Sequence, residues 1–161
     1  MRKVVVNSTP LIILCKIGRL DILQKLYHEI FIPTAVYREV TVVEDSACIQ
    51  IKNALEWVHV ESIREYTDKK MYKAKLHDGE VEVMILAQDQ KADLVIIDDN
   101  AAKKTAKYPG LTVTGTLGVL IKAKRQGIID SLYPFLAEMK QNGFYIDPML
   151  EEMVLQQAGE R

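Results

Sequence analysis

The sequence lacks several features that would place it outside the ordinary globular proteins. It has two cysteines, Cys15 and Cys48, and neither lies in a C-x-x-C or histidine-rich context. They are therefore interpreted as reduced thiols that pack as small hydrophobic residues. No apolar run approaches the roughly 18 residues that a membrane-spanning helix needs, and no signal-peptide cleavage pattern is present. We expect a cytoplasmic protein with no membrane association.

Neither sign of charge is in excess. Lysine and arginine number 21 against 22 acidic residues, a formal net charge of −1. This balance excludes a general polyanion binder but leaves room for a local basic strip that faces a nucleic acid. There is also no internal repeat, low-complexity tract or Pro/Gly-rich linker. With 161 residues, of which 48% are hydrophobic, the chain is predicted to form one domain with a substantial core.

Strand-like and helix-like segments alternate along the chain. Short, continuously apolar runs predict buried parallel strands over 3–6, 29–33, 57–60, 93–99 and 111–114. Helical spacing of apolar residues predicts helices over 10–18, 20–27, 33–41, 46–56, 78–90, 100–107, 115–125, 130–141 and 147–157. Residues 61–76 predict a loop or an exposed helix. The alternation indicates an α/β fold with a central parallel sheet and helices on both faces. In such sheets, ligands bind beyond the carboxyl ends of the strands.

Oxygen-bearing side chains occur at several of these strand ends and helix termini. Asp98 and Asp99 end a buried strand, Glu80 lies in the first turn of a helix, and Glu39 lies near the end of another. Each has a purely structural alternative: Asp99 as a helix cap, Glu80 as a partner of the helix dipole, Glu39 as a solvated surface residue. Together with Asn7 at the end of the first strand, they form the set of hard oxygen ligands that Mg²⁺ or Mn²⁺ prefers.

Five ordered motifs resemble those of PIN-domain proteins, and in particular an uncharacterised branch related to VapC-like toxins. They are "VVVNSTPLI", "IFIPTAVYREV", "LHDGEVEVMILA", "LVIIDDNAAKKTA" and "LTVTGTLGVLIKAKRQGII". The resemblance implies a PIN-like domain over 1–146, with a C-terminal helix over 147–161 packed on the same domain. It also implies a metal-dependent ribonuclease of the toxin type, an antitoxin protein as partner, and a homodimer.

The resemblance also implies roles for individual residues. Glu39, Glu80, Asp98 and Asp99 are the expected catalytic acids, and Asn7, Glu80 and Asp99 the expected metal ligands. Ser8 and Thr116 are expected contacts to RNA, and Lys103 and Lys104, which belong to the basic cluster after the acidic pair, are expected to bind its phosphate backbone. A further acid that many PIN domains carry has no counterpart, because this stretch reads Thr114-Gly115-Thr116.

Asn7 stands where the family has its first acid, and an amide ligates a metal with one negative charge fewer. Three explanations are open: a natural member with reduced or lost activity, compensation by Asp98, or a deliberate Asp→Asn change. The predicted function is a Mg²⁺- or Mn²⁺-dependent ribonuclease that cleaves single-stranded RNA. The alternative is a catalytically silent module that binds RNA or a protein.

A nucleotide-binding α/β protein is a weaker third interpretation, because no glycine-rich loop follows the first strand. The segment Thr114–Gly118 opens a helix whose N-terminus suits a phosphate. Its glycines equally suit close packing of helix and sheet.

Overall fold

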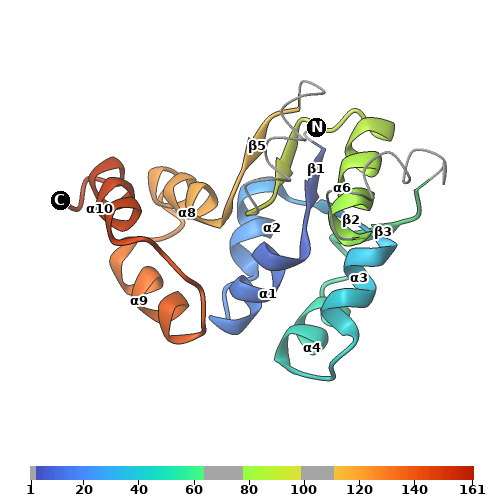
Figure 1. Cartoon of the computed structure of the whole chain (residues 1–161), viewed down its shortest axis with the longest axis horizontal. Coiled ribbons are helices and arrows are strands. Elements are labelled where there is room, and N and C mark those ends of the chain that lie inside the picture. Colours follow the sequence, from blue (N-terminus) through green and yellow to red (C-terminus); the bar gives the residue numbers. More distant parts are fainter. Residues whose placement is uncertain (1–2, 64–77, 99–110) are drawn as a thin grey trace.

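The structure is a computed structural model that describes residues 3–63, 78–98 and 111–161. A five-stranded parallel sheet with the strand order β3-β2-β1-β4-β5 forms its centre (Figure 1). The strands are β1 (Val4–Val6), β2 (Ile30–Pro33), β3 (Val58–Glu61), β4 (Leu94–Ile96) and β5 (Val113–Thr114). All five of the predicted strands are therefore present, with small shifts at their ends. The predicted α/β class with a parallel sheet is confirmed.

The helices connect these strands and cover the sheet. They are α1 (Ser8–Lys16), α2 (Asp21–Tyr27), α3 (Thr34–Thr41), α4 (Ser46–Asn53), α6 (Asp78–Asp89), α8 (Thr116–Arg125), α9 (Tyr133–Gln141) and α10 (Pro148–Gln157). Helix α6 packs against β1, β2 and β4, whereas α2 packs against β2 and α8, and α8 against β5. Helix α2 lies in the crossover from β1 to β2 and α6 in the crossover from β3 back to β4, so right-handed connections place these two helices on opposite faces of the sheet. The helix predicted over 100–107 and the segment 64–77 lie outside the described residues.

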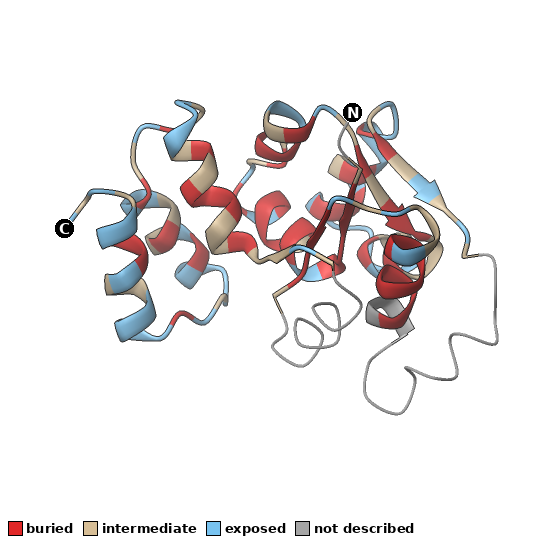
Figure 2. Ribbon diagram, turned by 90° about the horizontal axis from the view of Figure 1, so that it is seen from above, coloured by how far each residue is buried: buried red, intermediate tan, exposed pale blue. Residues whose placement is uncertain are grey.

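The central strands β1 and β4 lie within the hydrophobic core (Figure 2). Every residue of β1 and β4 is buried, because both faces of the sheet are covered. Such strands require continuous β-branched or aliphatic runs, and Val4–Val6 and Leu94–Ile96 supply them. Cys15 and Cys48 are buried free thiols in helices packed nearby. Burial raises the pKa of the Cys15 thiol to about 12, so this group stays protonated at neutral pH.

Local sequence signals set the helix boundaries. Pro10 lies in the first turn of α1, where its missing N–H costs no helical hydrogen bond. After α1 the chain reverses through Gly18, whose φ of 70° suits a residue without a Cβ. The Asp45 side chain accepts from the Cys48 amide and begins α4, and Asp147 accepts from Met149 and begins α10. No helix within the described ranges has the length and apolar character to cross a bilayer.

Candidate functional site

The carboxyl edge of the sheet brings Asn7 and Asp98 onto neighbouring strand ends. Strands β1 and β4 pair in parallel with Val6 opposite Ile96. The Asn7 amide continues this ladder by donating to the Ile96 carbonyl at 2.9 Å. Asn7 and Asp98 therefore leave the sheet at the same edge, as the prediction from strand topology required. This edge is where side chains from several crossovers can face one ligand.

Asn7 is buried and its side-chain oxygen is unsatisfied. The residue is 4% exposed, and Oδ1 has no hydrogen-bond partner among the described residues. The backbone of Asn7 has the extended conformation of an N-cap of α1, yet its side chain makes no capping bond. Leaving a buried acceptor unpaired costs about 1–3 kcal/mol. A cation or a proton donor at this oxygen would remove that cost.

Glu39 of helix α3 contacts Ser8, the residue that follows Asn7. The Ser8 hydroxyl donates to Glu39 Oε1 at 2.9 Å, across 31 positions of sequence. Ser8 is buried, whereas Glu39 is exposed, so the hydroxyl holds a carboxylate that still faces solvent. Glu39 therefore belongs to the site rather than to an unrelated surface. The sequence predicted this placement from the position of Glu39 near the end of a helix, and the family resemblance implied it as well.

Asp98 is held by the start of helix α8. Its Oδ1 accepts from the Thr116 amide at 2.8 Å and its Oδ2 from the Thr116 hydroxyl at 2.6 Å. Thr116 is fully buried, which places it as a support for Asp98. The positive end of the α8 dipole thus faces a carboxylate of the protein itself. This arrangement disfavours a bound phosphate at the same helix end, which was the basis of the nucleotide-binding interpretation.

Gly118 allows α8 to approach the sheet. A Cβ at this position would lie 2.1 Å from Thr114 Oγ1, at the end of β5. A side chain at this position would therefore collide with that of Thr114 unless one of them shifts. The glycine of the Thr114–Gly118 segment serves close helix–strand packing, which in turn sets the position of the Thr116 amide. The sequence had offered this packing role as an alternative to phosphate binding.

One acidic residue of this region was missed at the level of sequence. Glu82 is buried in α6, and its Oε1 accepts from the Ala35 amide at 3.2 Å, at the start of α3. It thereby satisfies one of the amides at a helix N-terminus, where negative charge is favourable. The available signal was a second glutamate within the apolar run Val81–Ala87. Glu82 links α6 to the helix that carries Glu39.

The remaining predicted site residues fall outside what can be described. Glu80 lies in the first turn of α6, and its side chain is outside the described part, as are Asp99, Lys103 and Lys104. Within the described residues, no group of three or more histidine, cysteine, aspartate or glutamate side chains lies close enough to hold a metal. The donors that are described are the oxygens of Asn7, Glu39 and Asp98. Hard oxygens are the donor type that divalent cations prefer, and the Asn7 Oδ1 is buried without a hydrogen-bond partner among the described residues.

Comparisons with known proteins agree with this geometry. A five-stranded, all-parallel sheet with oxygen-bearing side chains at its carboxyl edge defines a class of α/β domain. The chain matches the family model DUF3368, described as a PIN domain, over residues 3–160. The protein therefore belongs to the PIN-domain family, and the match extends through α10, beyond the predicted boundary at residue 146. No curated protein matches the chain.

A solved structure shares the fold. It is a PilT N-terminus domain protein, SSO1118, from the hyperthermophilic archaeon Sulfolobus solfataricus. The TM-score is 0.50 at 16% sequence identity, with 75% of this chain and 92% of that chain covered. At this identity the likeness supports the fold alone. PIN domains are typically nucleases and generally use divalent metal ions.

Proposed function

We propose that this protein is a Mg²⁺- or Mn²⁺-dependent ribonuclease that hydrolyses single-stranded RNA. The observation that carries the proposal is the buried Oδ1 of Asn7 at the carboxyl edge of the sheet, which has no hydrogen-bond partner in the part of the chain that the structure describes. A fold has little reason to bury an acceptor without a donor unless a ligand completes it. Asp98 on the neighbouring strand and Glu39 beside Ser8 supply negative charge at the same edge.

Each described residue has a distinct part in this proposal. Asn7 would hold the cation together with Glu80 and Asp99, and Asp98 would add charge from the strand next to Asn7. Ser8 fixes one oxygen of Glu39, whose exposed carboxylate orients water and substrate. Thr116 fixes both oxygens of Asp98. When bound, the metal lowers the pKa of a water molecule and offsets charge on the phosphate.

The substrate follows from the same chemistry. A divalent cation held by Asn7, Glu80 and Asp99 would attract a phosphodiester, and Lys103 and Lys104 are proposed to bind the backbone of that substrate, a sequence-independent contact that weakens with salt. Thr116 was predicted to join them, but its described contacts are with Asp98. The antitoxin partner and the homodimer stay predictions.

A silent RNA- or protein-binding module is the second candidate, and Asn7 itself favours it. With an amide in place of a carboxylate, the site has one negative charge fewer to attract the metal and activate water. The same chain would then bind RNA without cutting it. Both candidates predict RNA binding, but only the ribonuclease predicts RNA cleavage.

The test compares this chain with Asn7→Asp in an RNase assay supplemented with Mn²⁺. The matched control is Asn53→Asp, which adds the same charge at an exposed position of α4. We expect Asn7→Asp to cleave single-stranded RNA about tenfold faster or more, Asn53→Asp to leave the rate unchanged, and EDTA to abolish cleavage. Equal cleavage rates for Asn7→Asp and the unmutated chain would show that Asn7 does not belong to the metal site. RNA binding with no cleavage by either protein would favour the silent module.

A further inference from the structure

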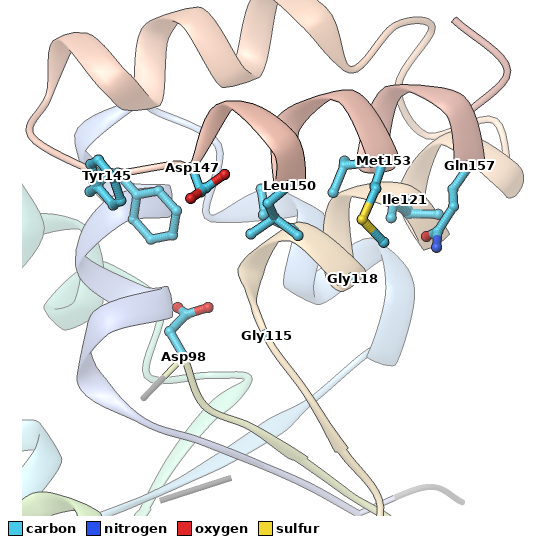
Figure 3. Close-up of a pocket in the computed structure, with 12 residues that line it drawn as sticks. Asp98, Gly115, Gly118, Ile121, Tyr145, Asp147, Leu150, Met153 and Gln157 are labelled. Carbon is cyan, nitrogen blue, oxygen red and sulfur yellow. The ribbon is translucent and has the colours of Figure 1, made fainter. Parts of the chain in front are cut away.

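A groove leads away from Asp98 between helices α8 and α10 (Figure 3). Its volume is about 590 Å³, and residues of α8, of α10 and of the segment that precedes α10 line it. Because Asp98 forms part of its wall, the groove is continuous with the candidate site. Sites for small organic ligands have volumes of about 300–1,000 Å³. The groove therefore has room for one nucleoside beside the carboxyl edge of the sheet.

The charges that line the groove favour the base of a nucleotide over its phosphate. Asp98 and Asp147 are its two charged side chains among the described residues, and none of the described lining residues is a lysine or arginine. Carboxylates without a cation repel a phosphate. A nucleobase is uncharged at neutral pH, so it is the part of a nucleotide that can enter.

Tyr145 offers an aromatic face at the acidic end of the groove. Its side chain lines the groove and is 81% exposed. In Figure 3, it lies toward the same end as Asp98 and Asp147, whereas Leu150 and Met153 lie further along. Bases of single-stranded RNA stack on tyrosine rings, and this contact tolerates any sequence because every base has a π-face. Tyr145 therefore supplies affinity for a base but not the choice among bases.

Asp147 is placed to make that choice. Its Oδ1 accepts from the Met149 amide at 2.8 Å, at the start of α10, so the helix fixes the orientation of the carboxylate. An ionised carboxylate has about four acceptor positions and no donor, so both oxygens can still accept from a ligand. Among the four RNA bases, guanine alone presents two adjacent donors, N1–H and N2–H, on its Watson–Crick edge. The other three bases place an acceptor beside each donor, and a carboxylate repels that acceptor.

We propose that this groove is a guanine-binding subsite for the RNA substrate. The base of one guanosine stacks on Tyr145, and its N1–H and N2–H donate to the Asp147 carboxylate. The adjoining phosphodiester stays outside the groove, at the carboxyl edge of the sheet beside Asp98. The protein then cleaves RNA next to a guanosine. This preference in cleavage rests on the proposed ribonuclease function, whereas the preference in binding needs neither metal nor cleavage.

The base preference is tested with fluorescein-labelled RNAs of about five nucleotides, titrated against the unmutated full chain in EDTA. Their sequences are UUGUU, UUAUU, UUCUU and UUUUU, and a fifth RNA carries inosine in the central position. We expect the guanine RNA to bind about tenfold more tightly than the other three standard RNAs. Inosine keeps N1–H but lacks the N2 amine, so most of the gain should be lost. Equal Kd values for the guanine RNA and the others overturn the proposal, as does a failure of all five RNAs to bind.

Asp147→Asn tests the residue that selects guanine. Asparagine caps a helix about as well as aspartate, so α10 should still begin at the same residue. The variant replaces one acceptor oxygen by a donor and should lose the preference for the guanine RNA. The matched control is Asp130→Asn, which removes the same charge at an exposed position outside the groove and should keep the preference. A guanine preference that survives in Asp147→Asn overturns the proposal.

Tyr145→Leu tests the stacking contact. All five RNAs should bind about tenfold more weakly, because stacking does not depend on the base. The matched control is Tyr133→Leu on α9, where the tyrosine is 52% exposed and does not line the groove. Unchanged affinities in Tyr145→Leu, or an equal loss in the control, overturn the proposal.

Two further measurements separate this proposal from its neighbours. Guanosine monophosphate should compete with the labelled guanine RNA at least about tenfold more weakly than unlabelled UUGUU does, since its phosphate carries more charge towards the carboxylates. Equal competition assigns the groove to a free nucleotide and overturns the proposal. Guanine preference in EDTA without any cleavage in Mn²⁺ contradicts the ribonuclease proposal alone. Cleavage in Mn²⁺ without a base preference contradicts the guanine subsite alone.

Discussion

Asp98 and Thr116 follow the neighbouring strands β4 and β5 and are joined by two hydrogen bonds of 2.8 and 2.6 Å. One bond comes from a backbone amide at the start of α8 and the other from a buried hydroxyl. Only the second can be removed by substitution, so the contribution of the hydroxyl can be measured separately. This relationship makes Thr116 a positioning residue for Asp98.

Thr116→Val should therefore loosen Asp98 while preserving the shape of the side chain. We expect the free energy of unfolding to fall by about 1–3 kcal/mol, since a charged acceptor loses a buried donor. Mn²⁺ binding, measured by isothermal titration calorimetry, should weaken as well. Thr116→Ser retains the hydroxyl and should restore the Mn²⁺ affinity. If Val and Ser behave alike towards Mn²⁺, the hydroxyl does not position the acid.

Asn7→Asp should make the metal-free protein less stable and the metal-bound protein more stable. Without metal, the change places a charge at a buried position whose oxygen has no partner among the described residues, at a cost of about 1–3 kcal/mol. With Mn²⁺, the new carboxylate gains a counter-charge, and ligand binding raises stability by mass action. Melting temperatures in EDTA and in Mn²⁺ measure both effects.

The decisive result is that Asn7→Asp lowers the melting temperature in EDTA and raises it in Mn²⁺. Asn53→Asp should shift the melting temperature equally in EDTA and in Mn²⁺, because it lies on the surface of α4. A response of Asn7→Asp that matches this control would remove Asn7 from the metal site.

The sequence was sufficient to predict the sheet and the edge at which the site lies. Continuous apolar runs such as Leu94–Ile97 are buried on both faces, and their alternation with helices predicts strands of a parallel sheet, although not the strand order. The placement of Asn7 and Asp98 at the same edge of the sheet followed from the rule that the carboxyl ends of parallel strands meet at one edge. No side-chain geometry was needed for that step.

Individual contacts were beyond the reach of the sequence. Ser8 meets Glu39 across 31 positions, and Ala35 meets Glu82 across 47. Both contacts depend on how α3 is rotated and packed between α1 and α6, which hydrophobic periodicity does not specify to within a side chain. The support of Asp98 by Thr116 similarly depends on how closely α8 approaches β5.

Glu39→Gln should remove the negative charge of residue 39 while keeping the hydrogen bond from the Ser8 hydroxyl. The amide oxygen of glutamine still accepts from the Ser8 hydroxyl, so the free energy of unfolding should change by less than about 0.5 kcal/mol. The affinity for Mn²⁺ should fall, because one negative charge is lost. Arg38→Gln on the same exposed part of α3 is the control. Arg38→Gln removes a positive charge, so a rise in its Mn²⁺ affinity as large as the fall in Glu39→Gln would point to the net charge rather than to Glu39.

Gly118→Ala should disturb the junction between α8 and β5. The new Cβ would lie 2.1 Å from Thr114 Oγ1, so the side chain or the helix must shift. Such overpacking costs about 1–3 kcal/mol in the free energy of unfolding, measured by urea denaturation. Adding Thr114→Ala removes the colliding oxygen and should recover most of the loss. A fully additive double mutant would show that the two positions do not collide.

Glu160 holds the C-terminal helices together and gives the protein an acid-sensitive contact. Its carboxylate accepts from Lys124 Nζ at 3.0 Å, Ser131 Oγ at 2.9 Å and the amides of Leu132 and Tyr133 at 2.6 and 3.1 Å. Burial opposes the charge, but these donors outweigh it and lower the pKa of Glu160 from 4.5 to about 2.

Glu160 should therefore stabilise the fold above pH 4.5 and lose this contribution as the pH falls towards 2, because the unfolded chain takes up the proton first. Glu160→Gln should reduce the free energy of unfolding by about 1–3 kcal/mol at pH 7. It should also flatten the fall in stability between pH 4.5 and 2, as measured by urea denaturation across that range. Glu152→Gln is the control, since Glu152 pairs with Arg161 at 3.3 Å on the surface, where an ion pair contributes little. A pH dependence that is the same in both variants would mean that the acid response arises elsewhere in the fold.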